Sequence, residues 1–138
     1  MKKTITILLL FLAVLSGHAQ YTAIPDTWFE QALYDQGLDD ILDGQVLTAN
    51  ISSLLQLQVG GYNIQSLAGI EDFISLEYLF CSNNQLTSLN LNTLTNLYEL
   101  DCSQNQFTSL DLTGVPSLYD VKCGNNQLTS LIVSGMPV

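Results

Sequence analysis

The chain has 138 residues, of which 47% are hydrophobic, and its thirteen acidic residues face only three lysines and no arginine. Its net charge of −10 would repel nucleic acid and anionic membrane surfaces, so we expect no nucleic-acid partner. The high apolar fraction argues against an acidic disordered tail and indicates a folded domain.

Residues 1–19 have the pattern of a secretory signal peptide. Lys2 and Lys3 precede an unbroken apolar run at residues 7–15, and the Gly-His-Ala sequence at 17–19 is a small-x-small cleavage site. The apolar run is shorter than the roughly 20 residues that cross a bilayer, so we expect no membrane insertion. We predict cleavage after Ala19 and a secreted or surface-exposed product with one lysine against thirteen acidic residues.

Residues 20–53 are predicted to form a helical N-terminal cap. A helix would begin near Thr27, which fits a capping box with Glu30, although Asp26 is a rival N-cap. Gly37 stands where this helix would end. We expect the helix to cover the open end of the first repeat rather than to bind a membrane or a partner. Its apolar face would consist of Trp28, Phe29, Ala32 and Leu33.

The sequence DDILDG at residues 39–44 matches the start of an EF-hand loop only in part. Asp39, Asp43 and Gly44 fit the first, fifth and sixth positions, but Ile41 and Asn50 occupy the third and twelfth. A plain acidic turn is therefore favoured, with weak calcium binding there or on the sheet as the alternative.

The rest of the chain is an internal repeat. Units of 21 residues at 76–96, 97–117 and 118–138 align without a gap, and a unit of 22 residues at 54–75 precedes them. The stretches CSNNQLTSL, CSQNQFTSL and CGNNQLTSL occupy the same slots in the last three units. The pattern L-x-x-L-x-C-x-x-N-x-L with a period in the twenties is the signature of the leucine-rich repeat.

The first seven slots of each unit alternate between apolar and polar residues, which predicts a short strand with one buried face. Strands of successive units would stack in parallel at about 4.8 Å. One coil cannot bury its apolar residues alone, so stacking would supply the stability. We therefore predict an α/β solenoid, with a parallel β-sheet on its concave face and a helical N-terminal cap.

Asparagine holds the ninth slot in the last three units, as Asn84, Asn105 and Asn126, whereas the first unit has Tyr62 there. An asparagine side chain satisfies backbone groups where the chain turns off the strand, and buried amides without a partner are costly. We predict this structural role for all three asparagines.

Cys81, Cys102 and Cys123 share the sixth slot and should point into the core as one column. Buried free thiols that act as small hydrophobic groups are the favoured state. A disulfide within the column is an alternative, although an odd number of cysteines leaves one unpaired. A metal site without histidine is less favoured still, so we predict no metal and no cofactor.

With these motifs, residues 54–138 resemble a bacterial leucine-rich repeat solenoid. The sequence IQSLAGIEDF at 64–73 is similar to internalin-type repeats. The segment IPDTWFEQALYDQGLDD, followed by coils of the NQLTSLNL type, resembles secreted surface proteins exported by type IX secretion. This resemblance implies surface attachment, further repeats and a C-terminal sorting domain, and it therefore implies that the sequence is truncated.

The outward slots of three strands would form one concave patch of aromatic and acidic side chains. Exposed aromatic clusters on a sheet are unusual without a partner, so we predict non-catalytic recognition of a protein or glycan ligand. The alternatives are a solvated surface and a spacer or scaffold segment of a longer adhesin. The predicted patch consists of Glu77, Tyr78, Phe80, Tyr98, Glu99, Asp101, Tyr119, Asp120 and Lys122.

A glycan-active enzyme is a distant third reading. Glu99 and Asp120 would be lateral neighbours, and paired carboxylates catalyse glycoside hydrolysis. An open sheet, however, offers no pocket that would raise the pKa of one carboxyl group. The only histidine, His18, lies in the predicted leader, which excludes the usual serine triad. We therefore predict that the protein is not an enzyme.

The last repeat would leave an apolar edge and unpaired strand amides exposed. Such edges favour association, so we predict self-association through the uncapped C-terminal repeat. The edge would be lined by Leu118, Val121, Cys123, Leu128 and Leu131.

Overall fold

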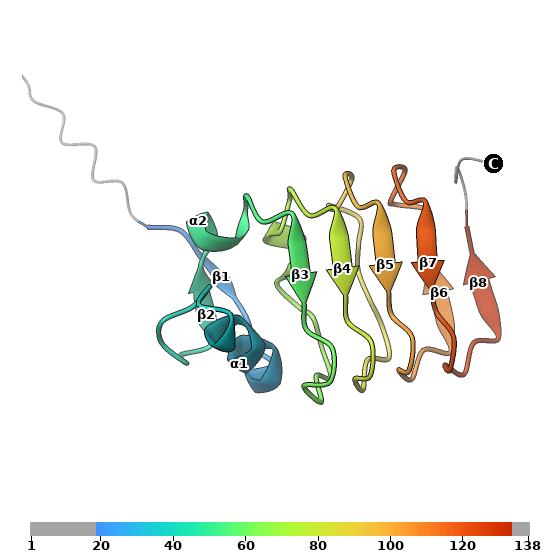
Figure 1. Ribbon diagram of the computed structural model, residues 1–138, viewed down its shortest axis with the longest axis horizontal. Coiled ribbons are helices and arrows are strands. Elements are labelled where there is room, and N and C mark those ends of the chain that lie inside the picture. The colour runs from blue at the N-terminus through green and yellow to red at the C-terminus, as the bar shows by residue number, and fades with distance from the viewer. Residues whose placement is uncertain (1–18, 134–138) are drawn as a thin grey trace, which may run out of the picture.

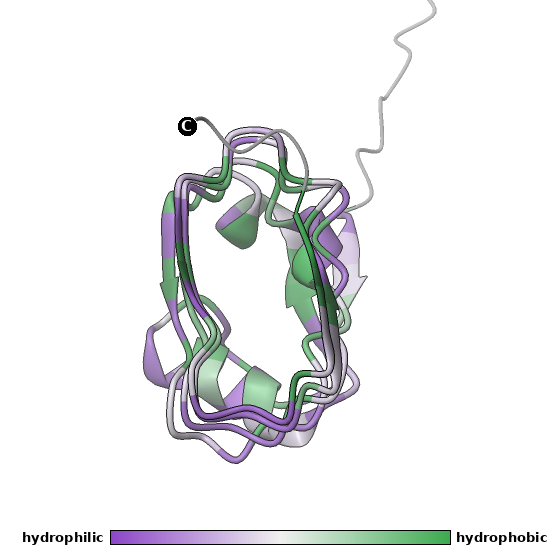
Figure 2. Cartoon of the chain, turned by 90° about the vertical axis from the view of Figure 1, so that its right-hand side faces the viewer, coloured by the Kyte–Doolittle hydropathy of each residue, from purple (hydrophilic) through white to green (hydrophobic). Residues whose placement is uncertain are grey.

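The repeats fold into coils stacked along one axis. The computed structural model describes residues 19–133. Figure 1 shows the coils side by side with one strand of each in a row, and along the axis they superpose as an oval ring (Figure 2). The predicted signal peptide up to residue 18, and residues 134–138 of the last predicted repeat, lie outside the described residues.

A four-stranded parallel sheet forms one wall of the solenoid, which confirms the predicted fold class. Its strands, in spatial order, are β3 (Gln56–Gln58), β4 (Tyr78–Phe80), β5 (Glu99–Asp101) and β7 (Asp120–Lys122). Because the repeats have nearly equal length, equivalent residues pair across the sheet. The central row of this register is Leu57, Leu79, Leu100 and Val121, of which the first three are buried and Val121 is partly buried.

A second parallel sheet lies on the opposite wall and was not predicted. It joins β6 (Ser109–Asp111) to β8 (Ser130–Ile132), again in register between equivalent slots (Figure 1). The alternation of apolar and polar residues around Leu110 was the available signal, although Ile132 interrupts it after Leu131.

The turn after each strand of the four-stranded sheet needs a left-handed residue at the eighth slot. The φ angle there is +80° at Gly61, +56° at Asn83, +53° at Gln104 and +56° at Asn125. Glycine and asparagine accept this conformation at low cost, whereas glutamine is unusual there. The left-handed turn therefore accounts for the glycine and the two asparagines at this slot, and Gln104 adopts the same conformation in the third coil.

Helix α1 (Thr27–Asp35) begins the cap, and Asp26 is its N-cap. One carboxylate oxygen of Asp26 accepts hydrogen bonds from the amides of Trp28 and Phe29, at 3.0 and 3.1 Å. The other accepts from the amides of Gln65 and Ser66 in the first coil, at 2.8 and 2.9 Å. This single side chain therefore both caps the helix and attaches it to the solenoid.

Two expectations for this helix were wrong. Glu30 is buried and does not complete a capping box, because its carboxylate accepts hydrogen bonds from the amides of Asp43 and Gly44 in the following loop. Trp28 is 51% exposed, whereas Phe29, Ala32 and Leu33 are buried as expected. The buried face is turned toward Glu30, since that side chain anchors the loop.

The helix ends as predicted at Gly37, whose φ angle is +70°. The amide of Gly37 donates to the carbonyl of Tyr34, and the amide of Leu38 donates to that of Leu33. This pair of bonds is the Schellman motif, which satisfies carbonyls left open at a helix end.

The cap also contains a ribbon that was not predicted. Strand β1 (Tyr21–Ala23) pairs antiparallel with β2 (Gln45–Leu47), and the short helix α2 (Thr48–Ile51) follows. Gly69 of the first coil, just before the 3-10 helix η1 (Ile70–Asp72), packs against this ribbon. A Cβ atom at Gly69 would lie 2.5 Å from the carbonyl oxygen of Ala23, so only glycine permits the contact.

The core runs without interruption from the cap through the coils. The rings of Phe29 on α1 and Phe73 in the first coil stack with centroids 6.1 Å apart. Each apolar slot then repeats one coil further on, which buries it against its equivalents. The cap therefore supplies the first coil with the apolar neighbours that another coil would otherwise provide.

Candidate functional site

The nine residues of the predicted concave patch lie on the outer surface of the four-stranded sheet or at its edge, and none is buried. Strand pairing places Tyr78, Glu99 and Asp120 in one row across the sheet, and it places Phe80, Asp101 and Lys122 in a second row. The other three patch residues, which lie one residue before their strands, are Glu77, Tyr98 and Tyr119.

Three tyrosines of the patch contact one another across three coils. The ring centroids of Tyr78 and Tyr98 are 6.2 Å apart in an edge-on arrangement, and those of Tyr98 and Tyr119 are 5.3 Å apart with planes inclined by 7°. Offset stacking of this kind is favourable and holds the rings in place. Since Tyr98 and Tyr119 cover part of each other's faces, the row presents ring edges and hydroxyl groups to a ligand.

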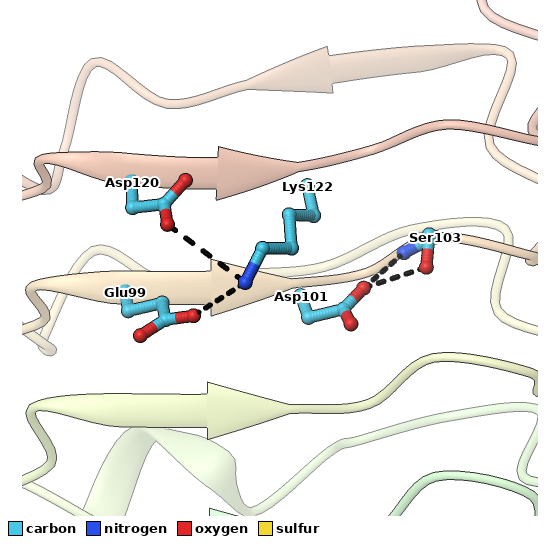
Figure 3. A network of polar contacts seen from close by, with 5 residues as sticks. All are labelled: Glu99, Asp101, Ser103, Asp120 and Lys122. Atoms are coloured by element: carbon cyan, nitrogen blue, oxygen red, sulfur yellow. Dashed lines mark hydrogen bonds and ion pairs between the residues drawn. The ribbon is translucent and has the colours of Figure 1, made fainter.

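The charged side chains of β5 and β7 in the patch form a network of polar contacts (Figure 3). The ammonium nitrogen of Lys122 is 2.7 Å from a carboxylate oxygen of Glu99 and 3.8 Å from one of Asp120. The hydrogen bond to Glu99 raises the pKa of Lys122. Asp101 instead accepts from the amide and hydroxyl groups of Ser103, at 3.0 and 2.6 Å. Together with Glu77, the patch holds four carboxylates and one lysine, so it is acidic.

The sheet surface begins one coil earlier than the predicted patch. Gln56 and Gln58 point outward from β3 and pair in register with Tyr78 and Phe80. Their signal was present in the sequence, because they occupy the same third and fifth slots as the patch residues. Along the sheet the outward chemistry therefore changes from amide to aromatic and then to acidic.

The asparagines at the ninth slot join each coil to the preceding one. The side chain of Asn105 accepts from the amide of Leu86 at 3.0 Å and donates to the carbonyls of Cys81 and Cys102, at 3.0 and 3.2 Å. Asn84 and Asn126 make the equivalent bonds in their own coils.

Tyr62, which replaces asparagine in the first coil, has a physical explanation. At least half of the hydrogen-bond partners of each ninth-slot asparagine belong to the coil before it. The first coil follows the cap instead of another coil, so an asparagine there would lack those partners. The amide of Tyr62 is itself bound by the side chain of Asn84 at 3.1 Å.

The three cysteines are free thiols, and Cys81 and Cys102 are fully buried. Burial, together with the neighbouring thiol, raises the pKa of Cys81 well above its usual value and that of Cys102 to about 12. These two thiols are therefore protonated and unreactive at neutral pH. Cys123 is only partly buried, because within the described residues no coil stacks beyond it.

Other kinds of site find little support in the described part of the chain. Among residues 19–133 no group of three or more His, Cys, Asp or Glu side chains is arranged to hold a metal ion. In the acidic turn, Asp39 accepts from the amide of Asp40 and Asp43 accepts from that of Gln45. No helix within the same residues has the length and apolar character needed to cross a bilayer.

Comparison with known proteins agrees with this fold. Residues 74–114 match the family of leucine-rich repeats in two copies. The functional domain of InlJ from Listeria monocytogenes, which includes a cysteine ladder, has a TM-score of 0.77 and 29% identity over 86% of this chain and 27% of that one. No curated protein matches the chain.

An internalin, InlF, from Listeria monocytogenes is similar in fold, with a TM-score of 0.52 and 20% identity over 91% of this chain and 48% of that one. The chain thus spans about a quarter of the InlJ domain and about half of InlF. The repeats, the stacked coils and these similarities support a bacterial leucine-rich repeat protein whose fold is like that of the internalins.

Proposed function

We propose that this protein is a non-catalytic recognition module, exported to the cell surface or beyond, that binds a protein or glycan through the outer face of its four-stranded sheet. The observation that carries the proposal is the row of Tyr78, Tyr98 and Tyr119, which are in contact and yet open to solvent. Large aromatic side chains that are already ordered provide contact area at little entropic cost, which is typical of interaction hot spots.

A protein partner with a basic surface fits this patch better than a glycan. Four carboxylates and one lysine flank the tyrosines, and the chain as a whole is strongly acidic. Complementary charge steers association and discriminates between partners. Glycans stack on open ring faces, whereas Tyr98 and Tyr119 stack on each other.

The same geometry disfavours catalysis. Glu99 and Asp120 are register partners on adjacent strands, but the ammonium group of Lys122 lies within 4 Å of both. Both carboxylates lie on the open surface of the sheet, and neither is buried. This arrangement supports a binding surface in place of an acid–base pair.

The test compares two double variants that remove tyrosines of equal exposure. Tyr98 and Tyr119 are 44% and 59% exposed, while Tyr34 and Tyr21 in the cap are 45% and 55% exposed. For a ligand identified from panels of surface proteins and glycans, Tyr98→Ala/Tyr119→Ala should lower the affinity at least about tenfold. Tyr21→Ala/Tyr34→Ala should leave it unchanged, and equal effects of the two variants would contradict the proposal.

A spacer or scaffold segment of a longer adhesin is the second candidate. It is favoured by the observation that the chain spans only 27% of the InlJ domain with which it superposes. Sequencing the gene beyond the codon for residue 138 distinguishes the two. Further coils with their own aromatic patches would support a spacer, and this chain alone would then bind no ligand found for the full array.

We also infer that residues 20–138 self-associate through the last coil. Leu131, Ile132 and Val133 are about half exposed there, and Val121 and Cys123 are incompletely covered. Apolar strand edges of this kind pair with other chains. Light scattering should show species larger than a monomer, and a monodisperse monomer that binds no hydrophobic dye would refute the inference.

A further inference from the structure

An open hollow of about 640 Å³ lies where the end of helix α1 meets the outer face of the first two coils. Its position differs from that of the tyrosine row, since among the patch residues it involves only Phe80. Pockets of a few hundred Å³ are the usual size for small-molecule and saccharide-sized ligands. The hollow is therefore large enough for one or two sugar rings.

The lining of the hollow carries no charged side chain, although the chain contains thirteen acidic residues. Three of the lining groups are side-chain amides, from Gln36 on α1 and from Gln56 and Gln58 on β3. Each amide both donates and accepts hydrogen bonds, as does the hydroxyl group of Ser82 on the same lining. A neutral ligand rich in hydroxyl groups matches such a lining, while an ion does not.

The amide of Gln36 is already held in position. Its nitrogen donates to the carbonyl of Ala32 on α1 at 2.7 Å and to the carbonyl of Gln58 on β3 at 3.0 Å. These two bonds leave the amide oxygen as an oriented acceptor at the junction of cap and sheet. Preorganised polar groups lower the entropy that binding must overcome.

Two aromatic rings complete the lining. Phe80 projects from β4, and Tyr62 stands at the slot that asparagine fills in later coils. Burial and the nearby carboxylate of Asp35 raise the pKa of Tyr62, so its phenol stays protonated at neutral pH. The apolar C–H faces of a sugar ring pack well against such rings.

Gly60 keeps the hollow open. A Cβ atom at this position would lie 3.0 Å from the carbonyl oxygen of Ser82, so a side chain here would press against the neighbouring coil. The equivalent slot of the next coils holds Ser82 and Ser103, which shows that the slot itself tolerates a side chain. The last coil again has glycine at this slot, Gly124, but a Cβ atom there would meet nothing within 4 Å, so the close approach to the next coil is a feature of Gly60.

We infer that this hollow, lined by Gln36, Gln56, Gln58, Tyr62, Phe80 and Ser82, binds a neutral saccharide unit. The amides and hydroxyl groups bind the sugar hydroxyls, and the two rings contact its apolar face. This site is separate from the tyrosine patch, so the protein has two recognition surfaces with different ligand chemistry. If the hollow were shown to bind no saccharide, the function proposed for the tyrosine patch would still stand.

The test uses glucose, galactose, mannose, N-acetylglucosamine and their short linear oligomers as probes. In a titration followed by amide NMR of residues 20–138, at least one probe should shift the resonances of Gly60 and Ser82. A dissociation constant of about 1 mM is typical for a single sugar ring. Absence of shifts at these amides for every probe up to about 50 mM would overturn the inference.

Two matched variants assign the binding to the hollow. Gln58→Glu keeps the shape of the side chain but adds a negative charge, and should weaken saccharide binding at least tenfold. Gln106→Glu adds the same charge at an exposed glutamine outside the hollow and should leave binding unchanged. The Tyr98→Ala/Tyr119→Ala variant should bind the probe normally. Equal losses in the two glutamate variants, or a loss only in the tyrosine variant, would refute the site.

Discussion

At the scale of single residues, Asn105 shows how one side chain can hold two coils together. It binds an amide of the preceding coil, a carbonyl of that coil and a carbonyl of its own, all in buried surroundings. A neutral residue with both donors and acceptors is needed for this, which is why asparagine recurs there. Each of these backbone groups would otherwise lose its hydrogen-bond partner on burial.

Asn105→Ala should therefore be strongly destabilising. The amide of Leu86 and the carbonyls of Cys81 and Cys102 would remain buried without their present partner, at a cost of about 2–4 kcal/mol. Urea unfolding followed by circular dichroism measures the loss. Asn96→Ala, at an exposed site, is the control and should change stability by less than about 0.5 kcal/mol. Equal unfolding midpoints would contradict the role given to Asn105.

The buried thiols predict a loss of stability at alkaline pH. Folding raises the pKa of Cys102 from about 9 to about 12, so the folded state holds a proton that the unfolded state releases. This contribution is complete below about pH 9 and is lost as the pH rises toward 12, by up to about 1.4 kcal/mol per pH unit. Urea midpoints at pH 8 and 10.5 should fall less in Cys102→Ala than in the parent. Identical pH dependence of the two proteins would exclude a titrating Cys102.

At the scale of elements, the cap is attached by contacts that tolerate little change. Asp26 ties helix α1 to the first coil, and the β1–β2 ribbon packs on Gly69. Because the cap closes the apolar end of the solenoid, loosening it exposes the core of the first coil.

Gly69→Ala should accordingly separate the cap from the first coil. Its φ angle is +100°, and the added Cβ atom would meet the backbone of Ala23, so we expect a loss of more than about 2 kcal/mol. Gly37→Ala is the control, because its φ angle is +70° but the space around it is empty. That variant should lose only about 1 kcal/mol. Thermal unfolding measures both, and similar midpoints would argue against a tight contact.

The sequence predicted the elements that repeat and failed on those that do not. Strands β4, β5 and β7 follow from a period of 21 residues, since each copy confirms the others. Strand β1 occurs once, has three residues and pairs with β2 more than twenty residues later, so no local pattern marks it. The burial of Glu30 likewise depends on a tertiary contact, since its carboxylate binds the amides of Asp43 and Gly44.

Of the two candidate sites, the repeat pattern predicted the tyrosine patch but not the hollow beside the cap. The outward tyrosines could be placed on one surface because their slots are fixed by the repeat. The hollow could not be predicted, because Gln36 comes from the cap and meets β3 only through tertiary packing. Tyr62, which stands where later coils have asparagine, lines the hollow together with Gln36 of the cap and Phe80 of the next coil.

At the scale of the whole molecule, each coil contacts only its neighbours, so stability should vary along the axis. Strands β4 and β5 have a paired strand on both sides, whereas β7 has one on a single side within the described residues. Hydrogen exchange at low protein concentration should be at least about tenfold faster in β7 and β8 than in β4 and β5. Uniform exchange rates would instead indicate that the solenoid opens as one cooperative unit.

The in-register sheet also separates the length of the molecule from the chemistry of its outer surface. Inward slots are nearly constant from coil to coil, while the outward slots differ in every strand. Duplicating a 21-residue unit would thus lengthen the molecule by one strand spacing, about 4.8 Å, without disturbing the packing of its neighbours. Reach and specificity can therefore evolve independently in such a protein, the first by copying a unit and the second by point mutation of its outer surface.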